Sequence, residues 1–276
     1  MSKKVWLVTG CSKGLGKALV EELIAQGHPV AGTSRNKEAF EKNIGVESNL
    51  FLPLSMNVKD ETDVKKAVAQ ATEKFGRIDV VVNNAGFTHL ATIEEMSDAD
   101  AREEFDINVF GTLNVIRSVL PQMRAQGSGH IFNVSSLGAY NVGPLSGIYC
   151  ATKHAVKAIS ETLAQEVKAF GIHVTDVKPG FMRTEFFGSS YKTTAPEESP
   201  YQHLYTENMK FYMGQNKNQA GDPKKAAKLY IKVAEMDEPY ENLPMGTDSC
   251  DGIHDICEDT VKWMEEIRSV AETTNF

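Results

Sequence analysis

Tyr149 and Lys153 are the side chains in this sequence best suited to move a proton. They stand four residues apart at the start of a segment that we predict to be helical, so both side chains lie on one face of the helix. A free tyrosine has a pKa of about 10, and a fixed ammonium nearby should stabilise the phenolate and lower that pKa. Tyr149 is therefore a candidate general acid or base.

A serine hydroxyl follows the neighbouring predicted strand. Ser135 and Ser136 come directly after the apolar run Ile131 to Val134. Such a hydroxyl could hold and polarise a substrate oxygen. A Tyr-x-x-x-Lys pattern alone is common and usually marks an exposed helical pair. The nearby serine favours the functional interpretation here.

A glycine-rich loop, Thr9-Gly10-Cys11-Ser12-Lys13-Gly14-Leu15-Gly16, lies between the first predicted strand and the first predicted helix. Glycines let the backbone approach a pyrophosphate, and free N–H groups at a helix start favour its negative charge. The spacing differs from G-x-G-x-x-G, and a lone loop of this kind also fits a plain tight turn. Its position in the first strand–helix unit favours a dinucleotide site.

The residues after the second predicted strand bear on the choice of cofactor. A carboxylate there would hold a ribose 2′-hydroxyl, whereas a cation accommodates a 2′-phosphate. The sequence has Thr33-Ser34-Arg35 and no acid, and Lys13 supplies a second cation. An arginine can bind a phosphate through two parallel hydrogen bonds. The pattern predicts NADP(H), and two solvated surface cations are the weaker alternative.

Apolar strand-like runs alternate with amphipathic helical stretches through the first 180 residues. The runs predict strands at 5–8, 30–33, 50–54, 78–82, 130–134 and 173–177, and helices at 14–25, 61–75, 105–124 and 148–170. Right-handed crossovers then give an α/β fold with a doubly wound parallel sheet of the Rossmann type. We expect a single domain over residues 1–276, with every motif at the carboxyl ends of the strands.

With these residues in view, the sequence resembles the short-chain dehydrogenase/reductase family over residues 4 to about 185, and in particular its hydroxysteroid- and retinol-dehydrogenase-like members. The matching motifs are Thr9-Gly10 through Gly16, Asn83-Asn84-Ala85-Gly86, Asn108, Ser136, Tyr149 through Lys153, and Pro179-Gly180 through Thr184. The family's spacing between the serine and the tyrosine identifies Ser136, rather than Ser135, as the catalytic serine.

The resemblance implies a role for each matching residue. Tyr149 transfers the proton, Ser136 orients the substrate oxygen, Lys153 holds the nicotinamide ribose and tunes Tyr149, and Asn108 anchors a water that relays protons. Together with the glycine loop and Arg35, the expected cofactor-binding set is Gly10, Ser12, Lys13, Gly14, Leu15, Gly16, Ser34, Arg35, Asn57, Val58, Asn84, Ala85, Gly86, Tyr149, Lys153, Pro179, Gly180, Met182 and Thr184.

The chain beyond Gly180 departs from the strand–helix rhythm. Residues 181–221 are expected to form a substrate lid, and residues 222–276 a helical extension with helices at 223–236 and 253–270 and a turn region at 239–246. The lid is rich in Phe186, Phe187, Tyr191, Tyr201, Tyr205, Met209, Phe211, Tyr212 and Met213. This content suits an apolar pocket for a hydrophobic ketone, aldehyde or secondary alcohol. Packing of the lid onto the body explains it nearly as well.

Composition excludes several classes of function. A net charge of −8 and a pI near 5.5 make nucleic acid a poor partner. No apolar run reaches the roughly 18 residues of a membrane span, and the first residues are too polar for a signal peptide, so we expect a cytoplasmic protein. The histidines and cysteines lack zinc-site spacing, which predicts catalysis without a metal.

Two other functions remain open, as does the oligomeric state. A non-catalytic NADP-binding regulator could keep the fold and lose the reaction, although it would not need Asn108, Ser136, Tyr149 and Lys153. A sugar-nucleotide epimerase or dehydratase would use a related Tyr-Lys pair, but usually with Gly-x-x-Gly-x-x-Gly. The chain also lacks the Val-Asp-Gly-Gly strand that helps many relatives form tetramers, so a homodimer or a monomer is as well supported as the tetramer.

Overall fold

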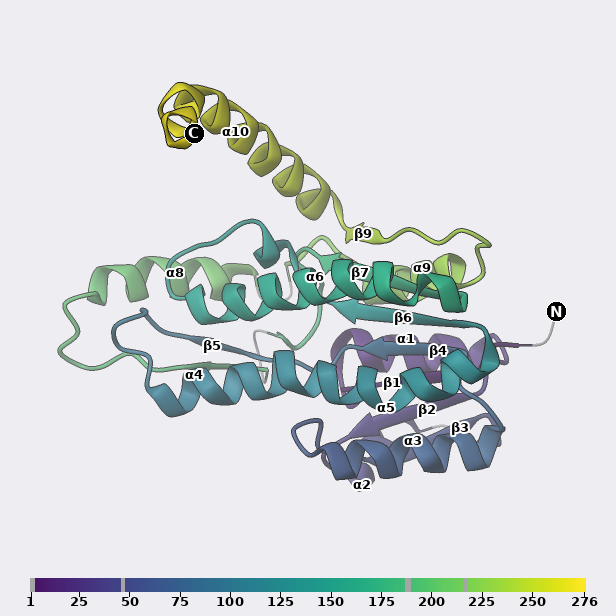
Figure 1. Ribbon diagram of the computed structural model, residues 1–276. Helices are drawn as coiled ribbons and strands as arrows, with labels where there is room; N and C mark the ends of the chain where they lie inside the picture. Colours follow the sequence, from purple (N-terminus) through teal and green to yellow (C-terminus); the bar gives the residue numbers. More distant parts are fainter. Residues whose placement is uncertain (1–2, 46–47, 187–189, 216–217) are drawn as a thin grey trace.

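The centre of the molecule is a parallel β-sheet (Figure 1). The computed structural model describes residues 3–45, 48–186, 190–215 and 218–276. The seven strands run in the order β3-β2-β1-β4-β6-β7-β9, and every neighbouring pair is parallel. Their bounds are β1 (Trp6–Val8), β2 (Val30–Ser34), β3 (Phe51–Ser55), β4 (Val80–Asn83), β6 (Gly129–Val134), β7 (Ile172–Pro179) and β9 (Asn242–Met245). The structure confirms the expected doubly wound α/β fold.

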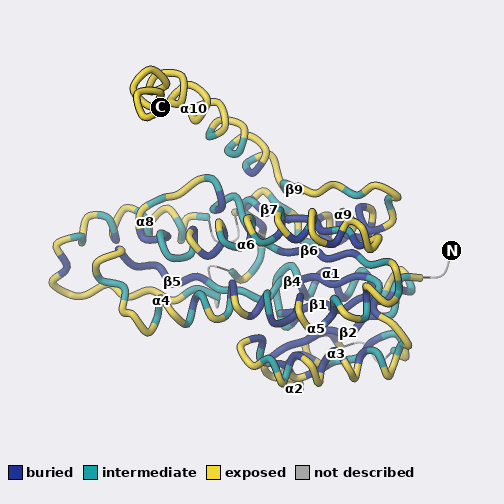
Figure 2. Tube along the Cα trace, viewed as in Figure 1, coloured by how far each residue is buried: buried dark blue, intermediate teal, exposed yellow. Residues whose placement is uncertain are grey.

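Helices cover both faces of the sheet, because successive residues of a strand point to opposite faces. Trp6 and Val8 enter the core beneath α1, α2 and α9, whereas Leu7 enters the core beneath α3, α5 and α6. The bounds of these helices are α1 (Gly14–Ala25), α2 (Lys37–Ile44), α3 (Glu61–Phe75), α5 (Gly111–Gln126), α6 (Gly147–Val167) and α9 (Pro223–Ala234). The two apolar cores leave the strands almost wholly buried (Figure 2).

The helix expected at 105–124 is part of a longer helical run. It begins as α4 (Asp98–Phe105), passes through the π-helical turn η1 (Asp106–Phe110) and continues as α5. Single π-turns inside α-helices are frequent at functional sites. The turn here carries Asn108, one of the expected catalytic residues.

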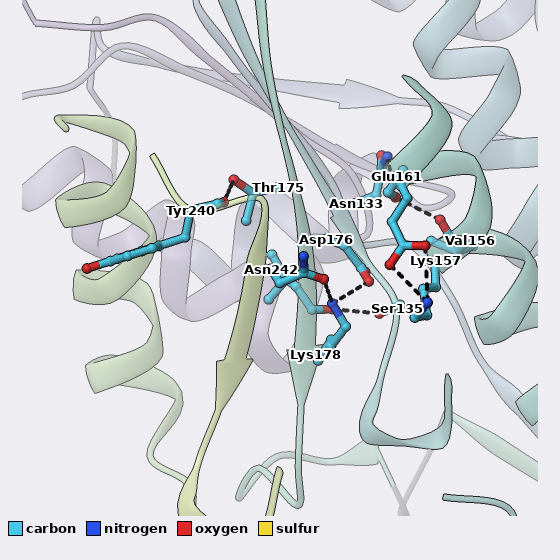
Figure 3. Close-up of polar contacts among 12 residues, drawn as sticks. Asn133, Ser135, Val156, Lys157, Glu161, Thr175, Asp176, Lys178, Tyr240 and Asn242 are labelled. Atoms are coloured by element: carbon cyan, nitrogen blue, oxygen red, sulfur yellow. Dashed lines mark hydrogen bonds and ion pairs between the residues drawn. The ribbon is translucent and has the colours of Figure 1, made fainter. Parts of the chain in front are cut away.

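The expectation of a turn region at 239–246 is wrong. Residues Asn242–Met245 form the edge strand β9, in register with Asp176–Pro179 of β7. Pro244 suggested a turn, but an edge strand tolerates proline because one side of the strand needs no backbone donor. Side chains also join the two strands, since Lys178 Nζ donates to Asn242 Oδ1 and lies 2.7 Å from Asp176 Oδ2 (Figure 3).

The segment expected as a lid holds two elements that the sequence did not indicate. Strand β8 (Tyr191–Thr193) pairs with β5 (Thr88–Leu90) in a small parallel sheet, and α8 (Gln202–Gln215) follows. β5 and α8 lie at the same end of the molecule as α4, with β5 between the two helices in the view (Figure 1). Tyr205 of α8 packs on Leu90 and Leu145, which ties the segment to the body. Phe187 lies outside the described residues.

The last long helix, α10 (Thr247–Ala271), projects away from the body (Figures 1 and 2). Its far half exposes apolar side chains, including Trp263 at 55% and Val270 at 71%. Short 3₁₀ turns complete the structure as η2 (Leu137–Ala139), η3 (Lys168–Phe170) and η4 (Glu272–Thr274). Within the described residues, none of the helices combines the length and the apolar character that crossing a bilayer requires.

Candidate active site

A cleft of about 750 Å³ lies along the carboxyl edge of the sheet, the expected position for a ligand in this architecture. It collects residues from the ends of β1, β2, β4, β6 and β7. The expected site residues that line it are Gly10, Ser12, Lys13, Gly14, Leu15, Ser34, Arg35, Asn57, Val58, Asn84, Ala85, Gly86, Ser136, Tyr149, Lys153, Pro179, Gly180, Met182 and Thr184. Gly16 and Asn108 do not line the cleft.

The glycine loop at the end of β1 forms a backbone cradle. Gly10 has φ +69°, and a Cβ there would lie 2.8 Å from the Cα atom of Ala85. The Asn84 Nδ2 atom donates to the carbonyl oxygens of Thr9 and Gly10 at 2.9 and 3.0 Å, which holds the loop from the β4 side. Gly16 leaves room for that amide, because its Cβ would lie 2.6 Å from Asn84 Nδ2. Gly16 therefore shapes the loop from behind the cleft.

Two cations line the part of the cleft formed by the glycine loop and the residues after β2. Lys13 is half-buried and Arg35 is exposed, and both line the cleft. Burial lowers the pKa of Lys13, and the positive charge of Arg35 lowers it further, while Glu185 opposes both effects. An anionic group between Lys13 and Arg35 would relieve this repulsion. The cradle and the paired cations together fit a phosphorylated dinucleotide.

The proposed proton-transfer residues meet at the other end of the cleft. Lys153 Nζ donates to the carbonyl oxygen of Val134 at 2.8 Å and lies 5.6 Å from the ring centroid of Tyr149. A hydrogen bond from Ser136 reaches the Tyr149 phenol. Gly138 lies against both Ser136 and Tyr149, since a Cβ there would lie 3.3 Å from Tyr149 Cε1 and 3.5 Å from Ser136 Oγ. The serine and lysine thus flank Tyr149 as the sequence predicted.

Burial dominates the electrostatics of Tyr149 and Lys153. It raises the pKa of Tyr149 above its ordinary value, and the hydrogen bond from Ser136 only partly opposes the shift. The expectation that Lys153 and an oxidised nicotinamide lower the Tyr149 pKa concerns the complex with the cofactor; in the protein alone burial raises that pKa. Burial lowers the pKa of Lys153 to about 8, against the opposing charges of Glu104 and Asp176. Both ionised forms are costly because low-dielectric surroundings disfavour charge.

Asn108 is buried in the π-turn and positions the backbone beside the site. Its Oδ1 atom accepts from the Phe87 N–H at 3.1 Å, and its Nδ2 atom donates to the Phe87 carbonyl oxygen at 2.9 Å. The same amide donates to Thr152 Oγ1 at 3.1 Å. Asn108 therefore joins the segment after β4 to α6, which carries Tyr149 and Lys153.

Comparison with known proteins assigns the chain to a family. The family model described as short chain dehydrogenase matches residues 4–195. The chain belongs to the short-chain dehydrogenase family. Its members are oxidoreductases that use nicotinamide cofactors, so this chain is an NAD(P)-dependent oxidoreductase, and the family expected from the motifs is confirmed.

Several relatives of this short-chain dehydrogenase cover most of its length. "Oxidoreductase BOA17" of Botryotinia fuckeliana is 37% identical over 89% of this chain and 90% of its own. "3-Ketodihydrosphingosine reductase" of Bacteroides thetaiotaomicron is 33% identical over 87% of each chain. A solved short-chain dehydrogenase from Streptomyces avermitilis aligns with a TM-score of 0.89 and 34% identity, covering 99% of this chain and 100% of that one.

Sequence reasoning missed three polar residues around the site of this dehydrogenase. Glu104 is wholly buried beneath it, although its acidic neighbours are typical of a solvated helix face. Glu103 and Lys192 form an ion pair of 2.6 Å at the rim of the cleft. Only the four-residue spacing between Glu104 and Asn108 could have suggested that Glu104 shares the buried face of its helix.

The substrate end of the cleft is mainly apolar. The apolar and aromatic side chains that line it include Leu90, Leu137, Val142, Phe181, Phe186, Tyr191, Phe211 and Tyr212. The ring of Phe186 lies 6.2 Å from that of Tyr149. The described residues contain no group of three or more His, Cys, Asp or Glu placed to hold a metal ion. Lys192 and Asn208 add polar atoms to this lining.

Gly10→Ala should lower the free energy of unfolding and weaken NADPH binding. Gly27→Ala is the matched control, because Gly27 also has a positive φ (+80°) but a Cβ there would meet nothing within 4 Å. The control should lose about 1–2 kcal/mol from backbone strain alone. Gly10→Ala should lose more, because its Cβ meets the Ala85 backbone. Urea unfolding and calorimetric titration measure both effects; equal losses and unchanged binding would contradict the cradle.

Proposed function

We propose that this protein is an NADP-dependent oxidoreductase that transfers a hydride between the nicotinamide and a carbonyl or secondary alcohol, with Tyr149 as the general acid or base. The observation that carries the proposal is the meeting of Tyr149, Ser136 and Lys153 in one cleft with the backbone cradle. Family membership supplies the reaction class.

In the proposed reduction the cofactor and three side chains each have a separate role. The bound nicotinamide supplies the hydride. Ser136 holds the carbonyl oxygen, and Tyr149 gives its phenolic proton to the oxygen as the alcohol forms. An alkoxide is a stronger base than a phenolate, so the raised pKa of Tyr149 still permits this transfer. The Lys153 ammonium stabilises the phenolate that remains. In oxidation the same proton returns to Tyr149.

The preference for NADP over NAD rests on Lys13 and Arg35. Arg35 follows β2, where a cation accommodates a ribose 2′-phosphate, and Lys13 stands close enough for the two charges to repel. A solved structure titled "ElxO with NADP Bound" has a TM-score of 0.74 to this chain at 25% identity. NADP bound to a protein of this fold supports the proposal for this chain.

We propose a hydrophobic ketone, aldehyde or secondary alcohol as the substrate. The aromatic lining from Phe181 to Tyr212 supports this class, because ligand sites are mostly apolar with few polar groups. A panel of steroid, retinoid, aryl and short aliphatic carbonyls, assayed with NADPH, tests it. Large apolar members should have the highest kcat/KM, and a preference for short polar members would reject the hydrophobic pocket.

The other functions considered from the sequence are less well supported. A non-catalytic regulator would have no use for the Tyr149, Ser136 and Lys153 arrangement, and no observation on the glycine loop favours an epimerase or dehydratase. A cytoplasmic location and a monomeric or homodimeric state remain predictions from the sequence.

Tyr149→Phe should abolish turnover, with kcat falling at least about a hundredfold, because the phenolic proton is lost. NADPH affinity should stay within about twofold, since the ring is kept. Tyr140→Phe is the matched control, because Tyr140 is half-buried and does not line the cleft. Steady-state kinetics and NADPH titration measure the two quantities. Unaltered turnover in Tyr149→Phe would refute the mechanism.

Arg35→Asp should shift cofactor preference from NADP toward NAD. The change removes a cation that would face the 2′-phosphate and supplies a carboxylate that can hold a 2′-hydroxyl. The ratio of kcat/KM values for NADPH and NADH measures the preference and should fall at least about tenfold. Lys37→Asp, an exposed change that lies outside the cleft, should leave the ratio unchanged. An unchanged ratio in Arg35→Asp would contradict the assignment of Arg35 to the 2′-phosphate.

A further inference from the structure

Glu104 is a buried carboxyl that does not line the cleft. Its side chain is 0% exposed, and its Oε1 atom accepts the His89 backbone N–H at 3.3 Å. Its Oε2 atom has no hydrogen-bond partner among the described residues. A buried carboxyl oxygen without a partner is costly and rare, so the position calls for a physical reason.

The helical run α4–η1 places Glu104 against the proposed catalytic helix. Glu104 and Asn108 lie one helical turn apart. Glu104 accepts a hydrogen bond from the His89 backbone, and Asn108 is hydrogen-bonded to the Phe87 backbone. The Asn108 side chain also donates a hydrogen bond to Thr152 Oγ1, and Thr152 directly precedes Lys153 in α6. α4 also packs directly on α6 and β5. The carboxyl therefore lies on the side of the helix that faces Lys153.

The balance of buried charge points to Lys153 as the partner. Among the described residues, the buried Asp, Glu, Lys and Arg side chains are Glu104, Lys153, Asp176 and Lys178. Asp176 Oδ2 lies 2.7 Å from Lys178 Nζ, so these two neutralise each other (Figure 3). Buried charges require such compensation. Glu104 and Lys153 are the remaining acid and base.

We propose that Glu104 is a buried titratable neighbour of Lys153 and a positioning residue for the proton transfer of Tyr149. The proposal rests on the proposed function of Tyr149 and Lys153. Glu104 acts through the lysine and the tyrosine without touching the substrate. Its charge is the largest that acts to keep Lys153 protonated, ahead of that of Asp176.

The protonation of Glu104 then changes the acid strength of Tyr149. Burial raises the pKa of Glu104 to about 8, while the His89 N–H and Lys153 oppose the shift. The ionised carboxylate raises the pKa of Tyr149, because it disfavours a second negative charge. Below about pH 8 Glu104 is neutral and this effect disappears. Ionised Glu104 thus disfavours the phenolate and favours the ammonium.

Other titratable groups surround Glu104. His89 comes from β5, while Tyr149, Cys150 and Lys153 come from α6. Asp106 follows on the same helical run, and Asp100 and Glu103 precede Glu104 on α4. Lys153 is the charge that acts on Glu104, whereas Asp100 and Glu103 act on His89. The ionised Glu104 carboxylate also raises the pKa of the Cys150 thiol.

Glu104→Gln separates this role from a purely structural one. The glutamine keeps an acceptor for the His89 N–H and removes the charge. Below about pH 8, where Glu104 is neutral, kcat/KM for alcohol oxidation should match the wild type; above it, where the variant lacks the carboxylate, kcat/KM should be about threefold or more higher because the pKa of Tyr149 is lower. Asp98→Asn removes a charge that is 80% exposed on the same helix and should leave the profile unchanged. A Glu104→Gln profile that superimposes on the wild type overturns the proposal.

Infrared titration of the protein alone gives a second readout. The wild type should show the C=O band of a buried, protonated carboxyl that disappears near pH 8, and Glu104→Gln should lack it. In Lys153→Met the band should persist to higher pH, because the opposing ammonium is gone. The comparison of the wild type with Lys153→Met still tests the proposal if Glu104→Gln does not fold. Absence of the band, or no change of its titration in Lys153→Met, overturns the proposal.

The two proposals can fail separately. An active Tyr149→Phe enzyme would reject the proposed function, while the infrared comparison would still report on the pairing of Glu104 and Lys153. An inactive Tyr149→Phe enzyme together with an unshifted Glu104→Gln profile would reject only the role of Glu104.

Discussion

The buried ammonium of Lys153 is the constraint around which the site is built. A buried charge is stable only when hydrogen bonds and opposite charge replace water. The Val134 carbonyl oxygen at the end of β6 accepts its hydrogen bond, and Gly86 lies beside it, since a Cβ there would be in ordinary contact with Lys153 Nζ at 3.6 Å. Each partner comes from a different strand end or helix. These strand ends and helices must therefore pack together correctly before the buried ammonium of Lys153 is stable.

The parallel sheet makes this convergence possible. Its strand ends bring the glycine cradle, the Ser136 turn and the residues after β7 to one edge, and the start of α6 adds Tyr149 and Lys153. A second buried pair, Asp176 and Lys178, lies within β7, and Lys178 also donates to Asn242, which ties β7 to the edge strand β9 (Figure 3). One buried pair thus stabilises the scaffold, and we propose that the other tunes the chemistry.

The sequence predicted the features that depend on local pattern. Buried parallel strands are continuously apolar, and the bounds of six strands were predicted to within two residues. The bounds of the helices α1 and α3 were predicted to the residue. Strand β9 contains Pro244 and pairs with residues far away in sequence, and α8 has little amphipathic pattern, so neither was predicted. Glu104 was missed because its burial follows from tertiary packing of a helix whose composition is acidic. The raised pKa of Tyr149 has the same origin, since burial outweighs the hydrogen bond from Ser136.

A crystal structure with bound NADP(H) tests the central claim most directly. The account predicts that the pyrophosphate lies on the cradle at Gly10, the 2′-phosphate contacts Arg35, and the nicotinamide ribose reaches Lys153 with the Tyr149 hydroxyl beside the ring. A dinucleotide bound elsewhere, or a nicotinamide ring out of reach of Tyr149 and Lys153, would contradict it.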